Sequence, residues 1–307
     1  MLRSMPEIET LYFYGHYWSV GSFSLLQCIG SSCAKLKVLI MYIIHSIRVP
    51  AAMPPIVLRC PLLEHVELDI DPSLSDPIML ALAHGCPALR TLHLKNGGTV
   101  VGMRAVLQGC PLLENLTLLA MLPYPSASSD LPLAETTLPS LSELHLVSTD
   151  ITDNQLCSLL CHTPNLTSLC LNCGPLITHT TVNTLAQYCK KLKEFLIPQQ
   201  AKICITIASM SALPPSVELL HVSARSTPAV TTVDLVTLAA GCPRLIDIVL
   251  PAFANDVTVE DILTFIGRCP RLRVFVYNCN DHSKIEDPRS DILTQRVKAL
   301  YPRLRFI

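Results

Sequence analysis

A short apolar motif recurs along the chain, and its period constrains the fold more than any other feature. The motif is a small residue, often Cys, followed by Pro, any residue and LxxLxL, as in CPALRTLHL at Cys86. Clear copies begin at Cys60, Cys110, Leu138, Thr163, Cys242 and Cys269, and weaker ones at Met5, Cys33, Cys189, Pro214 and Tyr301. The chain therefore reads as about 11–12 units of roughly 26 residues.

Each unit is expected to supply one strand and one helix. The alternation in LxxLxL places the second and third leucines on one side of an extended strand. Between the strands lie segments such as VTVEDILTFIGRC, in which Val259, Ile262, Leu263 and Ile266 have helical spacing. Strand, helix and strand in the same direction make a parallel ladder with right-handed crossovers. We expect longer convex loops at 123–138, 201–215 and 281–291, with a partner-binding loop or a modification site in the serine cluster as the alternative.

These elements predict an α/β fold, a right-handed solenoid of horseshoe shape that forms a single domain over residues 1–307. Parallel strands should line the concave face and helices the convex face, because helices are wider than strands. Each unit can bury its apolar side only against its neighbours.

Composition limits where such a protein can work. The chain is 50% hydrophobic and 15% charged, with a mean hydropathy of +0.42, so much apolar surface must be buried. The longest apolar run, Val38 to Ile44, is too short to cross a membrane. The first ten residues contain Glu7 and Glu9 and no apolar signal region. We expect no membrane association, and a net charge of -1 argues against a nucleic-acid partner.

The cysteines fit the same picture. A chain this long without an export signal is expected to keep its 14 cysteines reduced, in the cytoplasm or the nucleus. Seven of them recur at the junction between helix and strand, where we interpret them as small core residues: Cys33, Cys60, Cys86, Cys110, Cys189, Cys242 and Cys269.

The recurring CPxLxxLxL, with ITDNQLCSLL at Ile151 and ITHTTVNTLAQYCKKL at Ile177, resembles the cysteine-containing leucine-rich-repeat family. The resemblance covers essentially the whole chain. It implies similarity to the repeat domain of F-box substrate receptors, which select proteins for SCF-type (Skp1–cullin–F-box) ubiquitin ligases. The chain enters its first repeat at Met5 without an F-box motif. We therefore expect that a native N-terminal module or cap is missing, and that Skp1 or a cullin would bind through that module. The alternative is a scaffold or regulatory protein without a ligase.

A second cysteine group has the residue types of a zinc site. Cys157, Cys161, His162, Cys170 and Cys173 are close in sequence and include a CxxC. The repeat register points them in different directions, so no metal and no cofactor are predicted, and zinc binding is kept as a remote alternative.

Neither catalysis nor phosphate binding is favoured. No GxSxG, HExxH or glycine-rich phosphate loop is present, so an enzyme is not expected. A basic cluster in the last units is interpreted as a solvated face, with a phosphate site as the alternative: Arg268, Arg271, Arg273, Arg296, Lys298, Arg303 and Arg305.

The outward strand positions are the candidate binding residues, because their side chains serve neither core nor helix. On the concave face we expect a protein or peptide to contact His65, Glu67, His93, Asn115, Glu143, His145, Glu194, His221 and Asp247. The histidines could make binding pH-dependent. The outward positions near both ends are apolar and suggest partner contacts or surfaces covered by a missing segment: Val38, Ile40, Leu219, Val249, Val274 and Val276. A merely solvated surface is the alternative.

Overall fold

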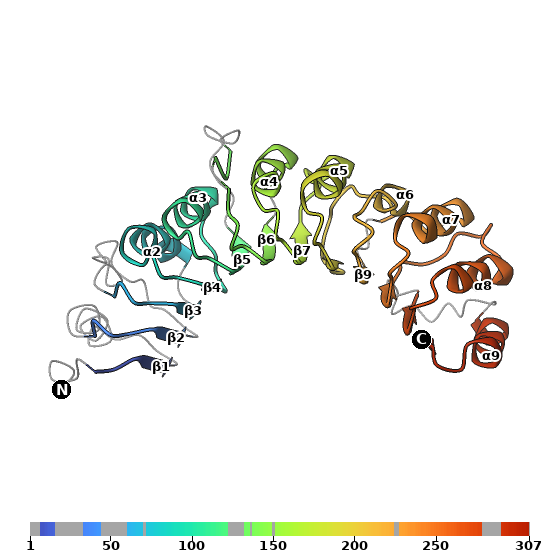
Figure 1. Cartoon of the computed structure of the whole chain (residues 1–307), viewed down its shortest axis with the longest axis horizontal. Helices are drawn as coiled ribbons and strands as arrows, with labels where there is room; N and C mark the ends of the chain where they lie inside the picture. The colour runs from blue at the N-terminus through green and yellow to red at the C-terminus, as the bar shows by residue number, and fades with distance from the viewer. Residues whose placement is uncertain are drawn as a thin grey trace. The chain divides into compact units, whose positions relative to one another are not determined.

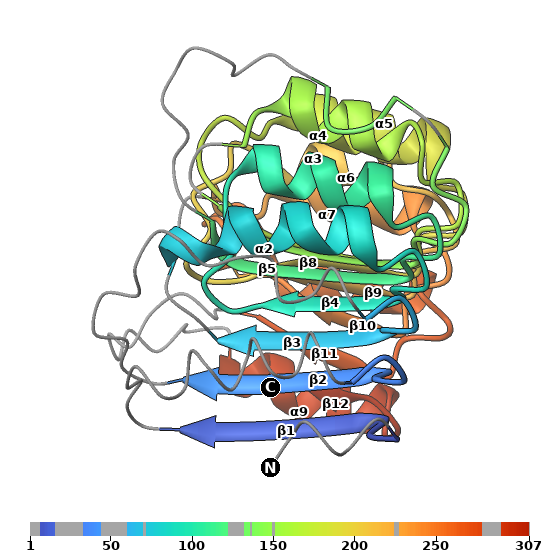
Figure 2. The same cartoon turned by 90° about the vertical axis from the view of Figure 1, so that its left-hand side faces the viewer.

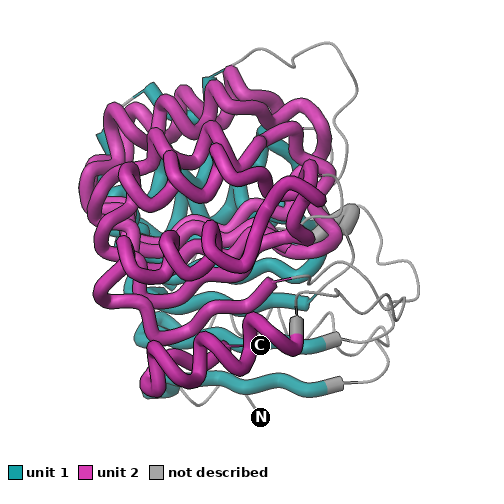
Figure 3. Tube along the Cα trace, turned by 90° about the vertical axis from the view of Figure 1, so that its right-hand side faces the viewer, with its two compact units in different colours: residues 1–150 teal, residues 151–307 magenta. Residues whose placement is uncertain are grey.

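The protein is represented by a computed structural model that divides into two compact units, Met1–Asp150 and Ile151–Ile307 (Figure 3). The structure describes residues 7–15, 33–43, 60–69, 72–121, 132–135, 137–148, 151–223, 227–277 and 290–306. Each unit is a stack of the same repeat.

The first unit is a ladder of parallel strands in chain order. The strands are β1 (Thr10–Gly15), β2 (Val38–Ile43), β3 (His65–Asp69), β4 (Thr91–Leu94), β5 (Asn115–Met121) and β6 (Glu143–Ser148). The helices α2 (Pro72–Gly85) and α3 (Val100–Gly109) lie together on one side of this ladder (Figure 2).

The second unit repeats this arrangement with more helices described. Its strands are β7 (Ser168–Cys173), β8 (Glu194–Ile197), β9 (Leu219–Val222), β10 (Asp247–Val249), β11 (Val274–Val276) and β12 (Arg305–Phe306). Its helices are α4 (Asp153–Leu160), α5 (His179–Tyr188), α6 (Ile207–Met210), α7 (Thr232–Gly241), α8 (Val259–Arg268) and α9 (Ser290–Leu300). They cover one side of their ladder and leave its other side to the strands (Figure 1). The predicted α/β leucine-rich-repeat solenoid is confirmed.

The core of each unit consists of the motif leucines. In the first unit Leu39 pairs with Val66, Val66 with Leu92 and Leu92 with Leu116, and all four side chains are buried. The residues between them are half-buried, as the alternation predicts. Burying one such side chain contributes about 1.5–3 kcal/mol to the free energy of unfolding. Because this burial occurs only against the neighbouring repeats, the stability of each compact unit comes from the stacking of its repeats.

The junction cysteines are buried free thiols, as predicted. The Cys86 Sγ donates to the carbonyl of Cys60 at 3.5 Å, and the Cys60 Sγ donates to the carbonyl of Cys33 at 3.6 Å. A small side chain with a weak donor therefore fills the space beside the preceding unit and occupies one of its carbonyl groups. Cys28 and Cys279 lie outside the described residues.

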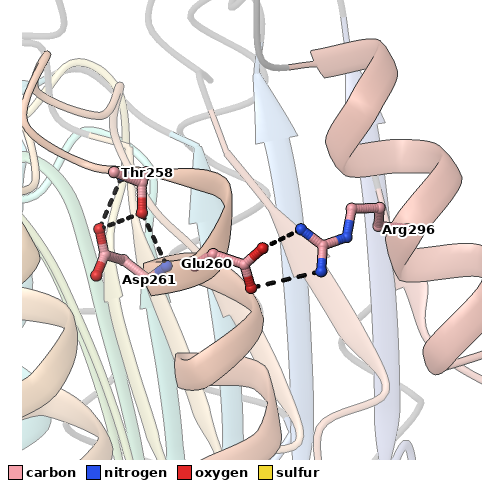
Figure 4. A network of polar contacts seen from close by, with 4 residues as sticks. All are labelled: Thr258, Glu260, Asp261 and Arg296. Carbon is pink, nitrogen blue, oxygen red and sulfur yellow. Dashed lines mark hydrogen bonds and ion pairs between the residues drawn. The ribbon is translucent and has the colours of Figure 1, made fainter.

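Threonine caps explain where several helices begin. The hydroxyl oxygen of Thr258 accepts from the backbone N–H of Asp261 at 3.2 Å, and the Asp261 carboxylate accepts from the Thr258 N–H at 2.8 Å (Figure 4). These bonds lower the pKa of Asp261, with the Thr258 hydroxyl as the main cause. Thr152 and Thr231 form the same reciprocal cap at α4 and α7.

Two details differ from the sequence expectations. The loop expected at 201–215 contains the short helix α6, which Thr206 caps. The second difference is the register at the C-terminal end. Aligning the motif prolines Pro270 and Pro302 would pair Val274 with Phe306, but the strands are shifted by one residue, so that Val274 pairs with Arg305 and Phe275 with Phe306. Phe306 thereby lies in line with the core residue Phe275, and the half-buried Phe306 ring stacks on it with 5.4 Å between ring centroids. The expected loops at 123–138 and 281–291 fall largely outside the described residues.

The alternation predicts opposite responses from neighbouring residues of β4. Leu92→Ala should lower the free energy of unfolding by about 2–5 kcal/mol, because the side chain is fully buried. Thr91→Ala, on the other side of the strand, should change it by less than about 0.5 kcal/mol. Urea unfolding followed by circular dichroism measures both, and a larger loss for Thr91→Ala would contradict the register.

Cysteine reactivity should follow burial. Burial raises the pKa of Cys86, Cys110 and Cys242 to about 12, so the reactive thiolate is scarce near pH 8. Iodoacetamide should label the exposed Cys161 and Cys204 rapidly in the folded protein and the buried three only after denaturation. Peptide mass spectrometry reads each site, and equal native labelling of Cys86 and Cys204 would contradict the packing.

Candidate interaction surface

The strand face, defined as the side of each ladder opposite the helices, carries the predicted binding residues. Its first-unit part holds six of them: His65, Glu67, His93, Asn115, Glu143 and His145. Its second-unit part holds the other three, Glu194, His221 and Asp247. Glu143 and Glu194 are exposed, and the rest are half-buried. In-register pairing fixes which of these side chains meet.

The Glu67 carboxylate is the centre of a contact network on β2, β3 and β4. Tyr42 pairs with Asp69 in the ladder, and its hydroxyl donates to Glu67 Oε1. The same oxygen lies 3.3 Å from His93 Nδ1. The Glu67 hydrogen bond, followed by burial, raises the pKa of Tyr42 to about 12, so this hydroxyl stays a donor at neutral pH.

A second network lies at the ends of the same strands. Asp69 accepts from Asn96 Nδ2 at 3.0 Å and lies 3.6 Å from Lys95 Nζ. The Lys95 ammonium is also 4.2 Å from the centroid of the Tyr42 ring. Tyr14 stacks on the Tyr42 ring, with 5.4 Å between centroids. Together these two networks form the acidic–aromatic cluster: Tyr14, Tyr42, Glu67, Asp69, His93, Lys95 and Asn96.

Sequence reasoning missed part of this cluster. Tyr14, Tyr42, Asp69 and Lys95 follow the LxxLxL motif and were not among the candidates. The missed signal is that the two-residue alternation continues beyond the motif, from Tyr12 to Tyr14 in β1 and from Glu67 to Asp69 in β3.

Two histidines on this face are poor proton acceptors. Burial lowers the pKa of His93, and the neighbouring Glu67 carboxylate partly opposes this effect. Burial, assisted by His93, likewise lowers the pKa of His145. The buried His93 Nε2 atom has no hydrogen-bond partner among the described residues. A protonated His93 ring would have no acceptor among these residues for its Nε2 proton, so the neutral form of the ring is favoured.

Side chains of β1 and β6 on this face are accessible to a ligand. Tyr12 and Tyr14 expose 57% and 68% of their surface, large fractions for aromatic residues. Within the described residues, the Glu143 carboxylate makes no hydrogen bond or ion pair. Asn115, its partner across β5 and β6, accepts from the Ser142 hydroxyl at 3.4 Å. Aromatic surface and a free carboxylate are therefore both available to a ligand.

In the second unit the predicted polar residues largely satisfy one another. His221 Nε2 lies 2.9 Å from Asp247 Oδ1, and the Ser168 hydroxyl donates to Glu194 at 3.0 Å. The predicted apolar positions Leu219, Val249, Val274 and Val276 are half-buried beside them. In the first unit the apolar positions Val38 and Ile40 are also half-buried.

The zinc candidates do not come together. Cys170 is half-buried on the strand face, Cys173 is buried, and Cys161 is an exposed residue at the end of α4. Cys157 accepts from the Thr184 hydroxyl at 3.1 Å, and His162 contacts the Ser158 carbonyl. Within the ranges that the structure describes, no group of three or more His, Cys, Asp or Glu residues is placed to hold a metal ion. Across the same ranges, no helix has the length and apolar character needed to cross a membrane.

No protein-family model and no curated protein sequence matches this chain. Similar solved structures include a leucine-rich-repeat protein of Leptospira interrogans, 17% identical, with a TM-score of 0.47 over 92% of this chain and 68% of that one. They also include a chain of the yeast Rad7 and Elc1 complex, 16% identical, with a TM-score of 0.42 over 93% of this chain and 77% of that one. Both are likenesses of fold alone.

The histidines predict an acid-sensitive first unit. Because the folded pKa values of His93 and His145 lie below the ordinary 6.5, the unfolded chain takes up protons first as the pH falls. Their stabilising contribution is complete above the unfolded pKa and is lost as the pH falls through the folded pKa. The free energy of unfolding should therefore decrease from about pH 7.5 to about pH 5.5.

The matched variant is His93→Gln combined with His145→Gln, whose unfolding free energy should change less with pH over this interval. Urea titrations at several pH values measure both slopes. An unchanged slope in the double variant would show that other groups cause the acid sensitivity.

Proposed function

We propose that this chain is a non-catalytic protein-binding module whose first-unit strand face holds an extended, basic segment of a partner protein. The observation that carries the proposal is the acidic–aromatic cluster, which lies on a helix-free face, includes the exposed ring of Tyr14 and adjoins the exposed ring of Tyr12. Aromatic side chains are enriched in protein interfaces and contribute much of their binding energy.

Charge defines the partner's chemistry. The carboxylates on this face are Glu67, Asp69 and Glu143, and the cation that accompanies them is Lys95, which directly follows β4. With both shifted histidines neutral, these four groups sum to a net charge of -2, from three negative and one positive. A segment with Lys or Arg side chains complements this charge.

The contacts also suggest where a partner cation binds. Lys95 shows that the cluster already holds an ammonium group against a tyrosine ring. The exposed Tyr14 ring offers a second such surface, and the Glu143 carboxylate offers an ion pair. Because Tyr42, Glu67 and His93 are fixed by mutual contacts, binding would cost little side-chain entropy at these positions.

The basic-segment proposal predicts loss of one partner in two matched pairs of variants. Tyr14→Ala and Glu143→Lys should each weaken partner binding at least about tenfold, because they remove an aromatic contact and reverse a charge. Tyr188→Ala on α5 and Asp256→Lys should leave it unchanged, since they make the same changes at exposed residues away from the strand face.

Affinity purification with quantitative mass spectrometry would identify the partner, and calorimetry with the purified partner would measure each dissociation constant. Binding should also weaken as salt rises. Equal losses in Tyr14→Ala and Tyr188→Ala would contradict the assignment of the surface.

We further propose that the bound protein is a substrate for an SCF-type ubiquitin ligase in the cytoplasm or nucleus. The support is the resemblance carried by CPxLxxLxL and by ITDNQLCSLL at Ile151. The full-length native protein should then co-purify with Skp1 and a cullin. If it retains its strand-face partner but brings down neither, the ligase proposal is wrong and a ligase-independent scaffold is the better account.

A further inference from the structure

A groove opens at the last junction of the second unit. Its cavity has a volume of about 500 Å³ and is lined mainly by apolar residues from the end of α8, the turn that follows α8 and the turn that follows α9. Ile266, Leu272 and Leu304 contribute side chains, Gly267 leaves one wall without a side chain, and Arg303 is the charged residue in the lining. We call this the junction groove.

The residue at the junction explains why a groove forms here. The two preceding repeats place Cys242 and Cys269 at this position, and both are fully or almost fully buried. The last repeat has Tyr301, whose ring is too large for the space that a thiol occupies. Its hydroxyl instead reaches the carbonyl of Leu263 at 3.4 Å and remains partly exposed. The tyrosine ring therefore separates the last repeat from α8.

The facing helix accommodates this ring with a glycine. A Cβ added at Gly267 would lie 3.1 Å from the Tyr301 hydroxyl, a close contact with the far end of a flexible side chain. Gly267 is exposed, so a larger side chain at this position would extend into the groove.

Arg303 gives the groove a positive charge. It is exposed and forms no ion pair within the described part of the chain. The same is true of Arg268 on α8 and Lys298 on α9, which do not line the groove. Two other arginines of the last repeats are already paired. Arg271 lies 3.5 Å from Glu218, and Arg296 joins α9 to α8 through Glu260 (Figure 4).

We propose that the junction groove binds a partner segment in which large apolar side chains are flanked by Asp or Glu residues. The apolar side chains would enter between Leu272 and Leu304, and a flanking carboxylate would pair with Arg303. The apolar lining favours a peptide over a nucleic acid, whose phosphates would use only Arg303. This ligand has the opposite charge to the one proposed for the first-unit strand face, so the inference does not depend on that function.

The test is fluorescence anisotropy with the whole chain and a labelled peptide, Gly-Asp-Glu-Leu-Phe-Glu-Asp-Gly. Two control peptides replace either the apolar pair by Ser-Ser or the four acids by their amides. The first peptide should bind saturably, and each control should bind at least about tenfold more weakly.

Variants locate the binding. Arg303→Glu should weaken it at least about tenfold, and Gly267→Leu should weaken it similarly by filling the groove without changing charge. Lys202→Glu is the matched control, because Lys202 is exposed and does not line the groove, and it should leave affinity unchanged. Thermal melting of each variant separates loss of binding from loss of folding. Tyr14→Ala should bind the peptide normally, so failure of the strand-face function would be recognised separately.

Three outcomes would overturn the proposal. They are absence of saturable binding, equal binding of the peptide without its apolar pair, and equal weakening by Arg303→Glu and Lys202→Glu. Displacement of the peptide by a single-stranded oligonucleotide, unaffected by Gly267→Leu, would assign Arg303 to a nucleic-acid contact instead.

Discussion

The burial of motif leucines between neighbouring strands is the interaction on which the rest of this structure depends. No single repeat can enclose its own apolar side, so Leu92 needs Val66 on one side and Leu116 on the other. This requirement holds the strands parallel and in register. It also sends every second side chain to the opposite face, where the core places no demand on it.

The register converts a linear sequence into surface columns. Glu67 meets His93 because their strands pair one residue to one residue, and the same rule sets Asn115 beside Glu143. An acidic–aromatic cluster in the first unit follows from the residues at these free positions, whereas the apolar groove of the second unit, with Arg303 in its lining, lies at the end of α8 and in the turns after α8 and α9. The two surfaces would select ligands of opposite charge, which is how one repeat fold could recognise more than one segment.

Most of the fold could be predicted from sequence because the motif encodes it directly. The strands, the buried junction cysteines and the outward positions from Thr10 to Val276 follow from period and alternation. The end of the pattern was less predictable. The sequence does not show that Phe306 gains more by stacking on Phe275 than by keeping the register, because that gain depends on ring packing in three dimensions.

The candidate site was predictable only in part for the same reason. Glu67 and His93 could be proposed from alternation, but their sharing of one carboxylate oxygen and the Tyr42 hydrogen bond depend on rotamers. The second-unit candidates His221 and Asp247 were placed correctly on the strand face. Their mutual contact, however, leaves them less available than Glu143. The repeat period predicts where a side chain lies, whereas its availability to a ligand depends on the contacts that it makes with neighbouring side chains.

Site-specific photocrosslinking tests the central claim most directly, namely that the first-unit strand face is a binding surface. A photoreactive phenylalanine analogue would replace Thr117, an outward residue of β5, or Val101, an exposed residue of α3 on the helix side. The account predicts that Thr117 crosslinks one partner protein at its basic segment and that Val101 does not. Crosslinking of that partner from Val101 and not from Thr117 would contradict it.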